Sequence, residues 1–271
     1  MKNTQQSDSL QLPQRWDKAI YWFKWYIKRY LPKYFHSLRI SKACNPEDPG
    51  NGPLIFILNH PSWWDPLVGI WLTELYPKRE AFCPMDARGM EKYKFFSWLG
   101  FYGVELDSPR GAVNFLRKSM AILSMPNSMI WITAQGKFTD PRERPIRLRN
   151  GVGHLAARLQ KGHAVPVAFE YCFWNERNPE ILVRFGQPIA LDQNDDLDAD
   201  GWTKIFSLEL QKTMDALSVE AQSRNPELFN CQFVSRSGVG GVYDIWRRFK
   251  SFLKGERFNP EHGFLDQEKQ K

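Results

Sequence analysis

Leu54-Ile-Phe-Ile-Leu58, followed directly by Asn59-His60-Pro61-Ser62-Trp63-Trp64-Asp65-Pro66, is the stretch that decides the fold. Five consecutive apolar residues have the length of a strand that is buried on both faces. The next apolar stretch, from about Pro66 to Leu75, has the composition of a helix. The sequence therefore predicts a strand, a polar loop and a helix, and in open α/β sheets functional sites form just beyond the ends of such strands.

The same alternation continues along the chain. Further strands are predicted near 101–106, 128–134, 164–171 and 181–185, and helices at 110–124, 149–160 and about 202–222. Because strands and helices alternate, we expect an α/β fold with a mainly parallel sheet flanked by helices. We divide the chain into an N-terminal amphipathic helical segment that associates with membranes, the α/β domain, and a C-terminal glycine-rich turn with a basic helix at 245–253; their bounds are 1–45, 46–225 and 226–271.

The composition restricts the class of protein. Apolar residues make up 42% of the 271 positions, including 11 Trp and 19 Phe, which excludes a disordered chain. Lys and Arg outnumber Asp and Glu by 37 to 30, and this net charge of +7 favours anionic partners. The four Cys residues are far apart and no signal peptide precedes them, so we expect reduced thiols in the cytoplasm. The longest uncharged span, 119–136, has a turn in its middle, and no transmembrane helix is predicted.

Residues 15–35, RWDKAIYWFKWYIKRYLPKYF, predict an amphipathic helix that Pro32 kinks or ends. A basic helix rich in Trp and Tyr suits the interface of a membrane with anionic lipids. A helix whose apolar side packs on the domain fits the same pattern. The first alternative predicts a peripheral protein at the cytoplasmic face of a membrane.

The loop after the first strand carries the side chains best suited to chemistry. Pro61 keeps His60 out of the α region, so its imidazole can meet the carboxylate of Asp65 at the start of the next helix. A carboxylate that holds Nδ1–H leaves Nε2 free to take a proton from a hydroxyl that attacks a carbonyl. The alternative makes Asp65 a plain helix N-cap and His60 a loop residue bonded to the backbone.

This loop resembles the H-x-x-x-x-D block of the glycerolipid acyltransferase family, the lysophosphatidate acyltransferase-like enzymes. Four further segments resemble that family's later blocks in the same order: Phe101–Asp107, Trp131–Gly136, Arg149–Gly153 and Ala164–Val167. Phe185-Gly-Gln-Pro-Ile189 is similar to a strand ending common in the family. The resemblance covers roughly residues 50–190.

The resemblance implies an O-acyltransferase in which His60 is the general base and Asp65 orients it. The donor would be an acyl thioester of coenzyme A or of acyl carrier protein, and the product an ester. No resident cofactor or metal is implied, and His154 and His163 lack ligand spacing. The candidate substrate contacts are Asn59, Arg110, Gln135, Gly136, Lys137 and Arg149.

The sequence departs from the family pattern where the acceptor is held. Gln135 replaces a Glu, Lys137-Phe138 replaces Thr-Arg, and the Arg expected near Ser108 falls at Arg110. Gln carries no charge and Lys lacks the bidentate fork of Arg, so the grip on a phosphate is weaker. We therefore expect an acceptor other than plain lysophosphatidate, such as a glycosylated or otherwise hydroxylated lipid.

Other functions compete with this one. A non-catalytic lipid-binding protein of the same fold is suggested by the altered third block, and the intact His60 and Asp65 argue against it. Nucleic-acid binding ranks low because no recognition motif accompanies the charge. The basic run at 142–149 suits either a coenzyme A phosphate or the acidic face of a carrier protein, or it is a solvated loop. The choice of donor, the acyl length and the oligomeric state stay open.

Overall fold

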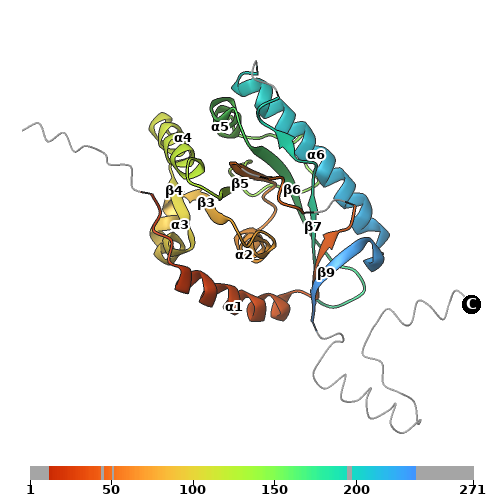
Figure 1. Cartoon of the computed structure of the whole chain (residues 1–271). Helices are drawn as coiled ribbons and strands as arrows, with labels where there is room; N and C mark the ends of the chain where they lie inside the picture. The colour runs from red at the N-terminus through yellow and green to blue at the C-terminus, as the bar shows by residue number, and fades with distance from the viewer. Residues whose placement is uncertain (1–11, 44–45, 51, 194–196, 236–271) are drawn as a thin grey trace, which may run out of the picture.

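The computed structural model describes residues 12–43, 46–50, 52–193 and 197–235 (Figure 1). Within them a nine-stranded sheet has the order β4-β3-β5-β2-β6-β7-β1-β9, with β8 paired to β6. The strands are β1 (Ser37–Ser41), β2 (Leu54–Leu58), β3 (Glu80–Asp86), β4 (Phe101–Val104), β5 (Ser128–Thr133), β6 (His163–Cys172), β7 (Glu180–Phe185), β8 (Ile189–Ala190) and β9 (Phe229–Val234). Pairing is parallel from β4 through β3, β5 and β2 to β6 and between β1 and β7, and antiparallel elsewhere. The predicted α/β fold with a mainly parallel sheet is confirmed.

Helices cover both faces of the sheet. They are α1 (Asp17–Tyr34), α2 (Asp65–Leu72), α3 (Ala87–Lys92), α4 (Pro109–Leu123), α5 (Gly151–Leu159) and α6 (Ala199–Ser223), with short 3-10 turns η1 (Thr73–Leu75), η2 (Lys94–Leu99) and η3 (Pro226–Leu228). Successive residues of β2 point to opposite faces. Ile55 and Ile57 join a core with α4, α5 and α6, whereas Leu54, Phe56 and Leu58 join a core with α1 and α2 (Figure 1).

Each of the three predicted segments of the chain contributes at least one strand to the sheet. Strand β1 lies within 1–45 and pairs with β7, and β9 lies within 226–271 and pairs with β1. Leu38 and Ile40 of β1 are buried, so this short strand contributes to the core. The predicted helix at 245–253 lies outside the described residues.

Helix α1 packs one side on the domain, as one of the two alternatives for this segment predicts. It does not end at Pro32 but continues to Tyr34, with Ile27 and Leu31 fully buried against the domain. Its other side leaves Tyr21 and Trp22 more than 60% exposed. No helix among the described residues is both long and apolar enough to cross a bilayer.

Candidate active site

The loop after β2 is anchored by long-range hydrogen bonds. Asn59 is buried, its Nδ2 donates to the Phe169 carbonyl oxygen at 2.9 Å, and its Oδ1 accepts from the Phe169 N–H at 2.7 Å. The N–H of His60 donates to Oε1 of Gln135 at 2.9 Å, and the His60 carbonyl accepts from the Thr139 N–H at 2.9 Å. The backbone of His60 is therefore fixed from both sides, independently of its ring.

The His60 ring meets the Asp65 carboxylate. Nδ1 of His60 lies 2.6 Å from Oδ2 of Asp65. The Ser62 N–H donates to the same oxygen at 3.1 Å, and the Tyr171 hydroxyl donates to Oδ1 at 2.7 Å. These three partners of the carboxylate lie outside α2, and Asp65 is the first residue of that helix. The plain N-cap interpretation of Asp65 is therefore wrong.

Electrostatics explain how this pair is held. Burial raises the pKa of the Asp65 carboxyl above its usual value of 3.8, while the hydrogen bonds from His60, Tyr171 and Ser62 oppose that rise. Burial also raises the pKa of Tyr171 well above its usual value, so its hydroxyl stays a donor. An ionised Asp65 accepts from Nδ1–H and thereby leaves Nε2 as the basic nitrogen.

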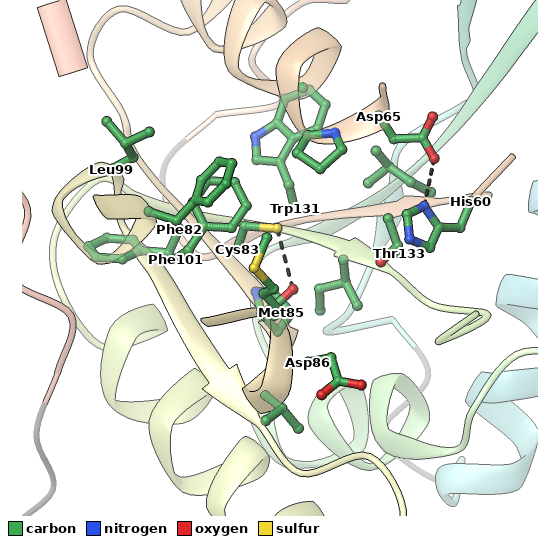
Figure 2. Close-up of a pocket in the computed structure, with 18 of the residues that line it drawn as sticks. His60, Asp65, Phe82, Cys83, Met85, Asp86, Leu99, Phe101, Trp131 and Thr133 are labelled. Carbon is green, nitrogen blue, oxygen red and sulfur yellow. Dashed lines mark hydrogen bonds and ion pairs between the residues drawn. The ribbon is translucent and has the colours of Figure 1, made fainter. Parts of the chain in front are cut away.

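A cavity of about 1050 Å³ adjoins the pair. His60 and Asp65 line it, and most of its other lining side chains are aliphatic or aromatic. Figure 2 shows Phe82, Leu99 and Phe101 gathered at one end of the drawn residues and His60 with Asp65 at the other. A large apolar cavity with a few polar groups at one place is the usual form of a site for an apolar ligand.

The candidate substrate contacts fall into two groups. Gly136, Lys137 and Arg149 line the cavity with His60. Gly136 has a φ of +68°, and a Cβ there would overlap the Arg149 side chain, so glycine lets the arginine cross the turn. Asn59, Arg110 and Gln135 are not among the lining residues.

The second group, Asn59, Arg110 and Gln135, lies elsewhere than on the cavity wall. Arg110 is exposed on the first turn of α4. Gln135 is buried and holds the His60 backbone, and it lines a second pocket of about 350 Å³. Asn59 ties the loop to β6. Asn59 and Gln135 therefore position His60 from behind.

Sequence patterns miss Tyr171 at this site, and two aromatic side chains complete it. Tyr171 bonds Asp65 from the end of β6, and the Phe138 ring lies with its centre 4.5 Å from that of His60. Trp63, one of two Trp residues that the sequence suggests as core and as wall of the site, is 51% exposed and lines the cavity. A polar-tipped residue at the carboxyl end of a predicted strand is the signal that could have found Tyr171. Among the described residues, no cluster of three or more His, Cys, Asp or Glu side chains could hold a metal ion.

Comparison with known proteins places the fold. No protein-family model and no curated protein matches this sequence. Among solved structures, the chain is similar to the 1-acyl-sn-glycerophosphate (LPA) acyltransferase PlsC from Thermotoga maritima, with a TM-score of 0.55 over 73% of this chain and 79% of that one. The sequence identity is 11%, so the likeness is one of fold.

Proposed function

We propose that this chain is a peripheral membrane O-acyltransferase at the cytoplasmic face of a membrane. It would move a fatty acyl group from a thioester of coenzyme A or acyl carrier protein to the hydroxyl of a lipid acceptor. The observation that carries the proposal is the 2.6 Å contact between His60 Nδ1 and Asp65 Oδ2 at the wall of a mainly apolar cavity of about 1050 Å³. The fold similarity to an acyltransferase supports it.

The chemistry follows from the free nitrogen of His60. Nε2 takes the proton of the acceptor hydroxyl as its oxygen attacks the thioester carbonyl carbon, and a tetrahedral oxyanion forms. The oxyanion collapses, the C–S bond breaks, and the imidazolium returns the proton to the thiolate sulfur. Asp65 stabilises the imidazolium between these steps. General-base help of this kind contributes about 10²–10⁴ in rate.

The oxyanion needs hydrogen-bond donors near His60. Gln135 accepts from the His60 N–H through its side-chain oxygen and does not line the cavity, so its amide nitrogen is not the donor. The turn of Gly136, Lys137 and Phe138 lines the cavity beside His60. We assign oxyanion stabilisation to the main-chain N–H groups of Lys137 and Phe138 in this turn.

The charges at the cavity support a neutral, hydroxyl-bearing headgroup. The Arg149 guanidinium donates to the Leu106 carbonyl at 2.5 Å and to Asp107 at 3.2 Å, so its fork is already occupied. The carboxylates of Asp86 and Glu105 also line the cavity. Of the other cations that line it, Arg15, Arg79 and Arg88 are already paired with carboxylates, and Lys24 and Lys137 are the remaining two. Carboxylates repel a phosphate and accept hydrogen bonds from hydroxyls, as a sugar or polyol headgroup would require.

This acceptor preference is testable with purified protein and a long-chain acyl thioester. We expect kcat/KM for lysophosphatidate to be at least about tenfold below that for a matched monoacyl glycolipid, since one lost charge-assisted contact is worth about 1.5–3 kcal/mol. Parallel assays with both acceptors at one chain length provide the comparison. A kcat/KM for lysophosphatidate near or above about 10⁵ M⁻¹s⁻¹ would contradict the expectation, because that is ordinary for a native substrate.

An aromatic surface supports membrane association. We define it by its exposed rings, which lie on α1 and at its N-cap, on η2 and in the loop before α2: Trp16, Tyr21, Trp22, Trp25, Tyr26, Tyr34, Trp63, Phe95 and Trp98. Contacts between Trp16 and Trp98 and between Phe23 and Phe95 join α1 to η2. Tyr26, Trp63 and Phe95 also line the cavity, so the cavity reaches this surface. Rings of this type bind at lipid headgroup level.

Removing two of these rings is expected to weaken membrane binding. Trp22→Ser with Trp25→Ser should lower binding to anionic vesicles at least about tenfold, because each substitution removes an indole whose apolar area the bilayer would cover. Co-sedimentation with vesicles measures this, and added salt should weaken wild-type binding through the basic residues of α1. Leu208→Ser with Val219→Ser, exposed residues of α6, is the control. Equal binding by the two double variants would contradict a docking role for α1.

The alternative is a non-catalytic lipid-binding protein of the same fold. Lipid binding alone does not require a buried carboxylate. Burial raises the pKa of the Asp65 carboxyl, and three donors stabilise it. A histidine base does require such a carboxylate, because the carboxylate orients the imidazole and then stabilises its positive charge. The geometry of Asp65 therefore favours catalysis.

A further inference from the structure

Strand β3 stops pairing with its neighbour β5 halfway along its length. It pairs with β5 from Glu80 to Phe82, which lie opposite Ser128 to Ile130. From Cys83 to Asp86 it pairs with β4 on its other side. Over the same stretch Trp131 to Thr133 of β5 continue to pair with β2. The sheet is therefore split between β3 and β5 at the end where His60 lies.

Pro84 explains the split. The Cys83 N–H donates toward β4, to the Gly100 carbonyl at 3.2 Å. Since the hydrogen-bonding groups of successive strand residues point to opposite sides, the nitrogen of Pro84 faces β5, where it has no hydrogen to donate. The Pro84 carbonyl accepts from the Cys83 thiol at 3.5 Å (Figure 2). The proline thus ends the ladder between β3 and β5.

The split connects the two faces of the sheet within one cavity. On the α1 and α2 side the cavity is lined by Ile70, Phe96 and Leu99. On the α4 and α5 side it is lined by Phe115, Ile132 and Val152. Cys83 and Met85 of β3 and Trp131 and Thr133 of β5 line it at the split (Figure 2).

The volume fits two hydrocarbon chains. A methylene group fills roughly the space of one water molecule, about 30 Å³, so a chain of sixteen carbons needs roughly 500 Å³. The cavity measures about 1050 Å³, about twice that size. Two apolar sides that meet beside the candidate base would bring two separate chains to one reaction point.

We propose that the cavity encloses two hydrocarbon chains at once, with the acceptor lipid's chain on the α1 and α2 side of the sheet and the donor's acyl chain on the α4 and α5 side. This inference rests on the proposed function. The first side adjoins the aromatic surface, from which a membrane lipid would enter. The adjoining pocket of about 350 Å³ includes Leu148, which packs on the core of the second side. Arg147 lines this pocket and Lys137 lines both it and the cavity, and these cations suit the anionic part of a soluble thioester.

Two unreactive probes test whether the chains bind together. S-hexadecyl-coenzyme A, a thioether, represents the donor, and dodecyl β-D-glucoside below its micelle concentration represents the acceptor. Calorimetric titration of each probe, alone and with the other at saturation, should give affinities that agree within about threefold, and native mass spectrometry should show the ternary complex. Competition between the probes would overturn the proposal.

Side-chain substitutions test which side takes which chain. A Cβ at Gly69 of α2 meets nothing within 4 Å although the residue is buried, so Gly69→Leu extends into the cavity on the α1 side. It should weaken the glucoside at least about tenfold and leave the thioether within threefold, whereas Leu116→Trp on α4 should do the reverse. Gly69→Ala controls for loss of the glycine, and Val113→Trp, on an exposed α4 position, controls for the added indole.

The outcomes separate this inference from the proposed function. Weakening of the same probe by Gly69→Leu and Leu116→Trp would overturn the assignment of the two sides. Binding of both probes by a chain that transfers no acyl group would contradict the proposed function and leave the two-chain cavity standing. If the chain transfers acyl groups but the two probes compete, the two-chain cavity would be contradicted and the proposed function would stand.

Discussion

His60→Ala is expected to lower the rate of acyl transfer at least about 100-fold while the protein stays folded. The ring supplies the base, whereas the bonds to Gln135 and Thr139 that hold this residue come from its backbone. The side chain is 17% exposed at the cavity wall, so its loss opens little new space in the core. Steady-state rates at saturating donor and thermal unfolding measure the two effects.

A matched variant separates loss of the base from loss of volume. His60→Gln keeps a polar side chain near Asp65 but has no group that can take a proton, so it should be as inactive as His60→Ala. Added imidazole should restore part of the activity of His60→Ala, because the vacated position adjoins the cavity. Activity of either variant within threefold of wild type would contradict the mechanism.

The core of the site could be predicted because its determinants are local. A buried strand, a proline after His60 and an Asp five positions later allow the imidazole and carboxylate to meet, and the resemblance to the acyltransferase blocks favours this interpretation over a plain N-cap. The contacts that support them come from distant parts of the chain: Tyr171 is 106 positions from Asp65, Phe169 is 110 from Asn59, and Gln135 is 75 from His60. Patterns within one segment hold no information about such partners.

The strands β3, β1 and β9, which the sequence prediction misses, interrupt the apolar pattern of a strand in different ways. Strand β3 carries charged ends and Pro84 in its middle, and a proline within a run argues against a central strand. Yet β3 lies between β5 and β4, and its proline is tolerated because the sheet is split there. Strands β1 and β9 are short and mix polar with apolar residues, so only their partners define them.

Asp65→Asn is expected to lower the rate of acyl transfer about 100-fold and at the same time to stabilise the protein at neutral pH. The amide can replace the carboxylate atom by atom. The Ser62 N–H requires an oxygen on the His60 side, and the Tyr171 hydroxyl can turn to accept from the amide nitrogen. The Nδ1–H tautomer of His60 is then kept, but the negative charge that stabilises the imidazolium is lost.

The stability effect follows from the pKa of Asp65. Burial raises this pKa above 3.8, so the folded protein binds the proton more tightly than the unfolded chain does. The contribution of this group to stability is therefore fully present below pH 3.8 and is lost as the pH rises through the raised pKa. The amide does not titrate in this range. The free energy of unfolding of Asp65→Asn, relative to wild type, should consequently increase from pH 4 to pH 8.

Urea unfolding at pH 4, 6 and 8, with acyl transfer measured at pH 8, tests both halves of this prediction. Tyr171→Phe is the matched control, because it removes one donor to Asp65 and keeps the charge. It should retain far more activity than Asp65→Asn and should be less stable than wild type at pH 8. A variant Asp65→Asn that is inactive and also less stable at pH 8 would show that the carboxylate holds the loop together, and the assignment of its charge to catalysis would fail.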